Sequence, residues 1–526
     1  MIKKLFKFSL ILIGLLSLGL IYMNFIGLET NKFNQLIKDK ISKDNKKLEL
    51  DLNAIKILFK ISNLSVNLKI VDPVLIFNRS RIELNQVESN LSIKSIIKQN
   101  FSITNLLIST KEINIKEIIS IIRSYKNNPE LFILQKIVKE GQLIADININ
   151  FDEKGKIKDD YNIKGLVKNT SLNLLNKKKI NLLNFNFRIK NKVYLIDDIK
   201  AKFSEVNFVS KSIEIKSVNN NIYVNGFLRN AQSDIKTELL DFILGENIND
   251  LKKIDFYSEN EFSFNIDKKY KIKDLLINSK IKLNELDYII NVKNLKKYLP
   301  NFKNKITLKN NLINLSFKNN QMNLSGEGFF EINDTKDKLE YKLIKKINDE
   351  FLFDLKIIFE QNPLLISFLK YEKKNKVKSL LEIKALYKKE NIRFNQILLK
   401  KKKNEFLIEG LTLNEKLKID QIDKIKLNFL NKEKTSNIIE LERKKKNYYI
   451  KGKIFDADTL LYQMLEGNDD DGFSKLFYDL NSTLKINVDK VYLDKKSYLN
   501  NVKAKIIFRK SELDNLNLVS KFSDNK

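Results

Sequence analysis

Lysine and carboxylate side chains are the groups of this chain that could do chemistry, because it contains no histidine, cysteine or tryptophan. This composition removes disulfides, thiol nucleophiles, histidine general bases and the usual ligands of zinc and haem. The densest acidic cluster runs from Asn468 to Asp471, but Gly472 is misplaced for an EF-hand loop and the closing glutamate is missing. We therefore expect no metal there, only a solvated loop whose aspartates cap a helix over Phe473 to Leu480.

Catalytic motifs are also missing from the sequence. Gly326 and Gly328 lack the third glycine and the strand-to-helix context of a dinucleotide site, and no phosphate-binding loop or nucleophile elbow is present. Carboxylate pairs are abundant, but nothing distinguishes one from another, so a carboxylate-only hydrolase stays open as an alternative. We predict that the chain is not an enzyme and that it uses no cofactor.

Three basic runs could contact phosphates: Lys177 to Lys179, Lys400 to Lys403 and Arg443 to Lys446. Nucleic-acid binding would add arginines or stacking aromatics at base-reading positions, and these runs show neither. We predict no nucleic-acid partner. The runs are typical of solubilising hairpin turns, and the alternative is attraction to anionic lipid headgroups.

The overall composition is that of a basic globular protein. The 526 residues include Lys+Arg 96 against Asp+Glu 65, a formal net charge of +31, although an AT-rich genome accounts for part of the lysine excess. Such a charge favours an anionic membrane surface or nucleic acid as a neighbour. Only 14 glycines and 4 prolines occur, which favours one repetitive architecture over a string of linked domains.

An uncharged apolar run, Phe8 to Leu28, follows three early lysines and is long enough, at about 1.5 Å per residue, to cross the ~30 Å core of a bilayer. A cleaved signal peptide and a buried core helix are the alternatives, but the run is long and lacks a small-residue cleavage site. We predict a membrane anchor over residues 1–28, with the N-terminus cytoplasmic. Its membrane-facing residues would include Phe8, Leu12, Leu16, Leu20 and Phe25.

A short amphipathic helix is predicted within residues 29–46. Phe33, Leu36, Ile37 and Ile41 recur there at helical spacing among polar neighbours. The helix would either plug the end of the following sheet or lie on the membrane surface.

From Leu48 to the end the dominant period is two, which predicts half-buried strands. Clear runs are Leu48/Leu50/Leu52, Ile55/Ile57/Phe59/Ile61, Leu64/Val66/Leu68/Ile70, Ile147/Ile149/Phe151 and Leu183/Phe185/Phe187/Ile189. Short clusters such as Asn-Lys and Asn-Asn separate the runs, so we predict hairpins and an antiparallel meander over residues 47–526. Stacked hairpins at ~4.8 Å per strand would give an elongated sheet.

A loose pattern, apolar-x-apolar-x-Gly, recurs with glycine at Gly165, Gly226, Gly326, Gly410 and Gly452. Glycine inside a strand usually marks a bend or bulge. We therefore predict that these glycines curl the sheet into a groove.

One face of every strand is apolar, yet few helices are available to cover it. The candidate helices to cover it are Lys116 to Arg123, Leu131 to Val138, Ile235 to Leu244 and Thr459 to Leu465. The sheet must either close as a sandwich or barrel, or stay an open trough covered by a ligand. For an open trough the predicted lining is Ile147, Ile149, Phe151, Ile163, Val167, Leu183, Phe185, Phe187, Ile189, Ile222, Val224, Leu484, Ile486, Val488, Ile506 and Phe508.

This organisation resembles the AsmA-like family, which includes the AsmA, YhdP and TamB groups of Gram-negative envelope proteins. The likeness covers the whole chain by architecture: an N-terminal signal anchor, a linking helix, then hundreds of residues of alternating strands. By sequence it covers only the later part, where these stretches are similar to the family: Lys451-Gly452-Lys453-Ile454-Phe455-Asp456-Ala457, Val491-Tyr492-Leu493-Asp494 and Leu499-Asn500-Asn501-Val502.

The resemblance implies a single-pass inner-membrane protein with most of its chain in the periplasm and a β-groove that conducts phospholipid acyl chains between the inner and outer membranes. It also implies a role in outer-membrane integrity and an envelope protein partner. The sequence stops after Val519 with an Asp-Asn turn signal and no return strand, so we expect a C-terminally truncated fragment. The alternative function is a tethered scaffold, or a chaperone for outer-membrane proteins, with a closed β core.

Overall fold

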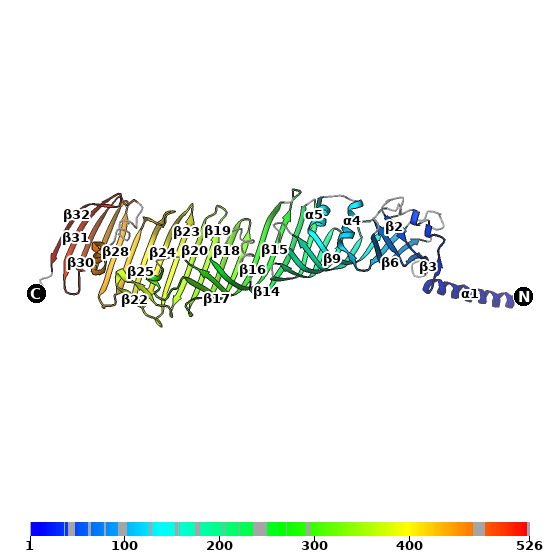
Figure 1. The fold of residues 1–526 in the computed structure, drawn as a ribbon, viewed down its shortest axis with the longest axis horizontal. Coiled ribbons are helices and arrows are strands. Elements are labelled where there is room, and N and C mark those ends of the chain that lie inside the picture. The colour runs from blue at the N-terminus through cyan, green and yellow to red at the C-terminus, as the bar shows by residue number, and fades with distance from the viewer. Residues whose placement is uncertain are drawn as a thin grey trace. The chain divides into compact units, whose positions relative to one another are not determined.

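The computed structural model describes residues 2–522 apart from 36, 40–47, 61–64, 78–79, 93–102, 126–128, 153–155, 157, 174–178, 204–205, 220, 235–249, 270, 291–294 and 467–478. The chain is mostly β, as predicted, with a few short helices (Figure 1). It divides into two compact units, which are described separately. Unit 1 comprises residues 1–231 and 261–273, and unit 2 comprises residues 232–260 and 274–526.

Unit 1 begins with helix α1 (Ile2–Phe25), whose segment Phe6–Phe25 is long and apolar enough to cross a membrane. All five predicted membrane-facing residues are exposed: Phe8, Leu12, Leu16, Leu20 and Phe25. The helix is shorter than predicted, because Gly27 adopts a positive φ of 74° and its N–H donates to the carbonyl of Tyr22. Leu28 was predicted inside the anchor and instead begins strand β1 (Leu28–Thr30).

The prediction of a linking helix within residues 29–46 is therefore only partly correct. Its first residues form β1, which pairs with β3 (Ala54–Lys60), and among the described residues only 34, 35 and 37–39 are helical. Ile37 packs against the buried cluster of Leu50, Leu52 and Ile55. This contact favours the first interpretation, in which the segment plugs the end of the sheet.

The strands of unit 1 form an antiparallel sheet in which β3, β4, β6, β7, β9, β10, β11, β12, β13 and β14 pair in that order, while β5 joins β2 to β6. The bounds are β2 (Leu48–Asp51), β4 (Ser65–Val71), β5 (Val74–Phe77), β6 (Ser80–Ser92), β7 (Ile103–Thr110), β8 (Ile113–Asn114), β9 (Val138–Asn150), β10 (Asn162–Asn173), β11 (Lys179–Lys190), β12 (Val193–Phe203), β13 (Val206–Val218) and β14 (Asn221–Asp234). Two helices lie between β8 and β9, α4 (Ile115–Tyr125) and α5 (Pro129–Ile137), close to their predicted places.

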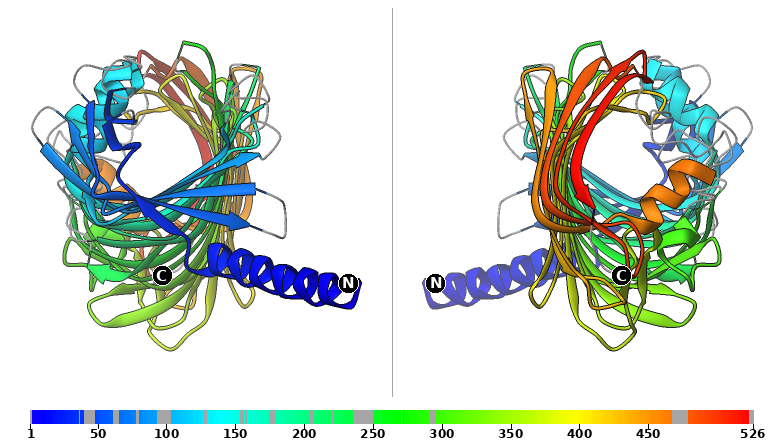
Figure 2. Two further views of the ribbon diagram at one scale, coloured as in Figure 1. Left: turned by 90° about the vertical axis from the view of Figure 1, so that its right-hand side faces the viewer. Right: turned by 90° about the vertical axis from the view of Figure 1, so that its left-hand side faces the viewer.

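Unit 2 continues the antiparallel pattern from β16 to β29. The bounds are β15 (Leu251–Ile266), β16 (Ile272–Ile289), β17 (Lys305–Lys318), β18 (Gln321–Ile332), β19 (Thr335–Lys345), β20 (Phe351–Phe359), β21 (Leu364–Ile366), β22 (Tyr371–Lys373), β23 (Ser379–Lys388), β24 (Asn391–Lys401), β25 (Asn404–Leu413), β26 (Ile419–Gln421), β27 (Lys424–Leu430), β28 (Ser436–Lys444), β29 (Asn447–Asp456), β30 (Ser482–Tyr492), β31 (Tyr498–Arg509) and β32 (Glu512–Phe522). Its helical elements are α7 (Leu295–Tyr298), η3 (Ser367–Leu369) and α8 (Asp458–Glu466). The strands are bowed, and the sheet curls (Figure 2).

Among the strand pairs of the described residues, one contradicts the predicted meander. Strands β29 and β30 are parallel, with Ile450 opposite Ile486. Parallel neighbours need a crossover connection, and the chain between them contains the predicted helix α8. The helix predicted over Ile235 to Leu244 and the acidic cluster at Asn468 to Asp471, with most of the helix after it, lie outside the described residues.

Two-residue turns join many of the hairpins, as the Asn-Lys and Asn-Asn clusters predicted. Asn319 and Asn320 adopt φ of 47° and 64°, and Lys389 and Glu390 adopt 47° and 65°. Positive φ at both central residues is the signature of type I′ turns, whose twist matches that of the flanking strands.

The recurring glycines act differently from one another. Gly452 faces a break in register and so lies at a bulge, as predicted, whereas Gly410 has a φ of 65° but no break in register beside it. Gly165 and Gly326 instead lie beneath the aromatic rings of Phe187 and Tyr341 on the neighbouring strands. The register is unbroken at these two glycines, so neither lies at a bulge, and the missing side chain makes room for a ring.

Gly326→Ala should destabilise unit 2 by about 1–3 kcal/mol, the usual cost of overpacking. A Cβ at this position would overlap Cζ of Tyr341, so the ring would have to move. Ser325→Ala, one residue away on the exposed face, is the matched control and should leave the unfolding midpoint unchanged. Chemical denaturation of both variants measures the difference, and equal midpoints would contradict this packing role.

Candidate functional site

One face of the unit 2 sheet is apolar from β17 to β24. Successive strands place apolar side chains opposite one another, with Leu315 opposite Leu324 and Leu343 between Leu324 and Phe353. These rows run across the strands, and neighbouring rows lie about 6.8 Å apart because side chains on one face repeat every second residue.

The opposite face is charged. Lys342 stands opposite Asp354, and Nζ of Lys356 lies 2.9 Å from Oε2 of Glu340. A shallow hollow of about 570 Å³ lies over these residues. Its charges alternate in sign, and no group of three metal-binding side chains occurs among the described residues.

The connections at the two edges of the unit 2 sheet differ in length. At one edge, here called the turn edge, β17 joins β18 through residues 319–320 and β23 joins β24 through 389–390. At the other, the insert edge, β16 joins β17 through residues 290–304 and β20 joins β23 through 360–378. The long connections carry α7 and the β21–β22 hairpin, so chain available to cover the apolar face is concentrated at the insert edge.

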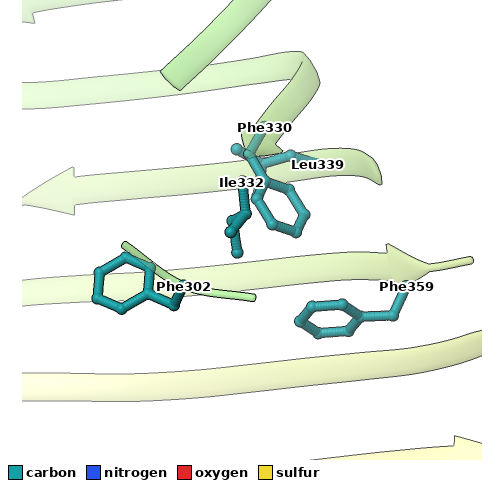
Figure 3. Close-up of a cluster of buried hydrophobic side chains, with 5 residues drawn as sticks. All are labelled: Phe302, Phe330, Ile332, Leu339 and Phe359. Carbon is teal, nitrogen blue, oxygen red and sulfur yellow. The ribbon is translucent and has the colours of Figure 1, made fainter. Parts of the chain in front are cut away.

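The first long connection covers the apolar face next to the insert edge (Figure 3). Phe302, from the 290–304 connection, is buried together with Phe330, Ile332, Leu339 and Phe359. The rings of Phe330 and Phe359 meet edge to face, with their centroids 5.7 Å apart. This part of the face is filled by protein and has no room for a ligand.

The second long connection covers the insert-edge side of β24 to β27. Tyr371 of β22 lies with its ring centroid 4.5 Å from that of Phe406 and 5.8 Å from that of Phe429. Leu369 and Leu399 complete the buried cluster. The β21–β22 hairpin therefore forms a second layer over the apolar face, as in a local sandwich.

Charged residues fasten the tip of this hairpin. Lys370, at a φ of 47°, places Nζ 2.7 Å from Oδ2 of Asp458 and 3.2 Å from Oδ2 of Asp456. Burial alone would lower the pKa of Lys370, but these hydrogen-bonded carboxylates outweigh it and raise the pKa above its usual range. The ammonium therefore stays charged and holds the tip against β29 and α8.

Buried polar groups fasten the base of the hairpin. Asp337 accepts hydrogen bonds from the backbone N–H groups of Glu360, Gln361 and Asn362 at 2.6, 2.8 and 2.9 Å. Nζ of Lys373 donates to the carbonyls of Glu360 and Asn362, and burial lowers the pKa of Lys373. Because Asp337 and Lys373 are both buried, the base is a fixed part of the fold.

The apolar face near the turn edge is not covered in this way. Apart from buried Ala385, its side chains are partly exposed or exposed, and none belongs to a buried cluster of the described residues. We call this surface the open strip, and it consists of Ile313, Leu315, Phe317, Met322, Leu324, Leu343, Phe351, Phe353, Tyr387, Ile392 and Phe394.

The open strip ends where both edges become covered. Over β25 to β30 the turn edge is closed by Ile422, which is buried with Tyr448 against Ile408, Leu441 and Leu484. The open strip is therefore confined to β17 to β24, and a second set of apolar side chains, which are more exposed, lies on β32: Leu513, Leu516, Leu518, Val519 and Phe522.

The predicted lining residues of unit 1 lie on one face of its sheet. Ile147, Ile163 and Ile189 are successive register partners, and Phe187 stands opposite Gly165. Most are partly exposed, but two are buried: Val167 and Val224. Those two cannot touch a ligand without a rearrangement.

The predicted lining residues of unit 2 also share a face. Leu484 lies opposite Ile506, and Ile486 follows two residues later on the same strand. Val488 is only 1% exposed and is not available to a ligand.

The open strip itself was not predicted from the sequence. Its signal was present in the alternation of Phe351 with Phe353 and of Ile313 with Leu315 and Phe317.

Comparison with known proteins identified no relative of this chain. The chain matches no family model, no curated protein and no solved structure.

Proposed function

We propose that this chain is a membrane-anchored envelope protein whose apolar sheet faces hold phospholipid acyl chains and pass them between the inner and outer membranes. In this proposal α1 spans the inner membrane, the strands lie in the periplasm, and transport supports outer-membrane integrity. The proposal includes no catalysis, cofactor or nucleic acid.

The open strip is the observation that carries the proposal. Partly exposed Leu, Ile, Met and Phe side chains stand in rows across β17 to β24, and none of them belongs to a buried cluster of the described residues. Contiguous apolar surface that is open to water is typical of a binding surface, because covering it contributes about 25 cal/mol for each Å² removed from water. Acyl chains fit rows of alternating side chains better than a folded partner does, because they need no hydrogen bonds.

The likeness to the AsmA-like family supports the same proposal from the sequence. It rests on an N-terminal anchor followed by alternating strands, and α1 and the curled sheets are consistent with that organisation. Lipid transport, the periplasmic location and an envelope partner come from this likeness.

A second candidate function is a tethered scaffold or a chaperone for outer-membrane proteins. The β21–β22 hairpin favours it, because a β-hairpin of this chain already packs on the apolar face through Leu369 and Tyr371. A face that accepts its own hairpin could accept one from an unfolded partner.

Isolation of the full chain without detergent, in polymer-bounded membrane discs, separates the two functions. After transfer to lipid-free amphipol and removal of unbound lipid, we expect at least one phospholipid to remain per chain. A protein that carries no phospholipid yet still slows the aggregation of an unfolded outer-membrane protein would overturn the transport proposal in favour of the chaperone.

A further inference from the structure

One charged side chain stands in line with the apolar rows of the open strip. Lys345, at the turn-edge end of β19, pairs in register with Met322 on one side and Phe351 on the other. These partners show that it shares a face with Leu343, two residues earlier. A lysine in this row breaks the apolar alternation, and it does so where the strip meets the turn edge.

The surroundings of Lys345 are amphipathic. Its Nζ lies 5.6 Å from the ring centroid of Phe351, whose centroid is 6.1 Å from that of Tyr387. Tyr387 stands opposite Phe351 in the next strand and is 42% exposed. The ammonium of Lys345 and the phenol of Tyr387 thus flank the ring of Phe351 at the boundary between apolar surface and water, where tyrosine is favoured.

The present partner of Lys345 is weakly held. Its Nζ lies 3.0 Å from Oδ1 of Asp349, whose side chain is 77% exposed. Ion pairs at this exposure contribute about 0–1 kcal/mol, so little is lost when the ammonium exchanges one anion for another. Lys345 is therefore available to an anionic group that approaches along the strip.

We propose that Lys345 and Tyr387 bind the phosphate of a phospholipid whose acyl chains lie on the open strip. This inference rests on the proposed function and adds to it the site and the class of headgroup. The ammonium donates to phosphate oxygens, the phenol hydroxyl donates beside it, and Phe351 lies between the two under the glycerol. Charge-assisted hydrogen bonds of this kind are about twice as strong as neutral ones.

The consequence is selectivity for a headgroup that carries phosphate. A diacylglycerol offers the same two tails to the strip but no anion to Lys345. The turn edge is the side on which the headgroup lies, because the insert edge is filled by Phe302 and by the β21–β22 hairpin.

The test compares two probes with identical tails and the same tail fluorophore, a phosphatidylglycerol and a diacylglycerol, bound to the full chain in amphipol. We expect the wild-type protein to prefer phosphatidylglycerol. Lys345→Glu should weaken phosphatidylglycerol binding about tenfold or more while diacylglycerol binding stays within about twofold. Lys345→Arg should keep the preference, and Tyr387→Phe should reduce it by a smaller factor.

Lys346→Glu is the matched control, since the neighbouring lysine lies outside the strip and pairs with Glu350 at 3.7 Å. Equal effects of Lys345→Glu and Lys346→Glu on phosphatidylglycerol would overturn the headgroup site while leaving lipid binding intact. A wild-type protein that binds neither probe would overturn the proposed function itself. Inorganic phosphate should not displace phosphatidylglycerol, and displacement would overturn the assignment to a lipid.

Discussion

Four aspartates placed on the apolar faces should lower the phospholipid that remains with the chain at least about tenfold. The variant combines Leu343→Asp and Phe353→Asp, which are register partners on the open strip, with Ile149→Asp and Phe187→Asp on the apolar face of unit 1. An acyl chain on such a surface would have to strip water from ionised carboxylates, which costs several kcal/mol each. Phosphate analysis of the purified protein measures the loss.

A control variant adds the same charge at the adjacent residues, whose side chains lie on the opposite face of each sheet. It combines Ile344→Asp, Leu352→Asp, Asn148→Asp and Asn186→Asp, and it should keep the lipid content of the wild-type protein. Circular dichroism verifies that both variants fold. If the two variants lose lipid equally, net charge rather than the apolar face controls binding, and the account of the open strip is wrong.

Asp337→Ala should lower the free energy of unfolding of unit 2 by about 3–5 kcal/mol, the range for a broken buried charge network. The carboxylate is 2% exposed and accepts the N–H groups of Glu360, Gln361 and Asn362. Its loss would leave Lys373 buried without its nearby negative charge. Chemical denaturation measures the change in stability.

Asp354→Ala, an exposed carboxylate on the charged face, is the control and should stay within about 0.5 kcal/mol of the wild-type value. Limited proteolysis should cut the β21–β22 hairpin of Asp337→Ala before the rest of unit 2. A hairpin that stays resistant with unchanged stability would show that its base is not held by this network.

The strands were predictable because their signal is local. Alternation such as Leu183/Phe185/Phe187 follows directly from a half-buried strand, and turns such as Asn319-Asn320 follow from residues that tolerate positive φ. The apolar run of α1 was predictable for the same reason. Its end was misplaced by three residues, because the C-terminal turn at Gly27 is set by backbone geometry inside an otherwise uniform apolar run.

The candidate site was less predictable because it depends on what covers the sheet. The long connections decide whether a row of apolar side chains is exposed or covered. Their contacts, such as the ring contact of Tyr371 with Phe406, join residues far apart in the sequence. The parallel pairing of β29 with β30 is likewise set by a crossover, not by either strand. Nothing in the sequence indicated that Lys345 belongs to the candidate site. A lysine in an alternating run usually marks the end of the apolar face, and only the strand register shows that Lys345 lies in line with the apolar rows.

The most direct test of the central claim is photo-crosslinking of lipid from single positions on opposite faces of β20. Benzoylphenylalanine replaces Phe353 in one protein and Leu352 in another, so the two probes are one residue apart and on opposite faces. Both proteins are made in cells grown with radiolabelled phosphate, which labels the phospholipids. We expect label on the chain with the probe at 353 and background label at 352. Background label at both positions, in proteins that are folded and anchored, would contradict an apolar face that carries phospholipid.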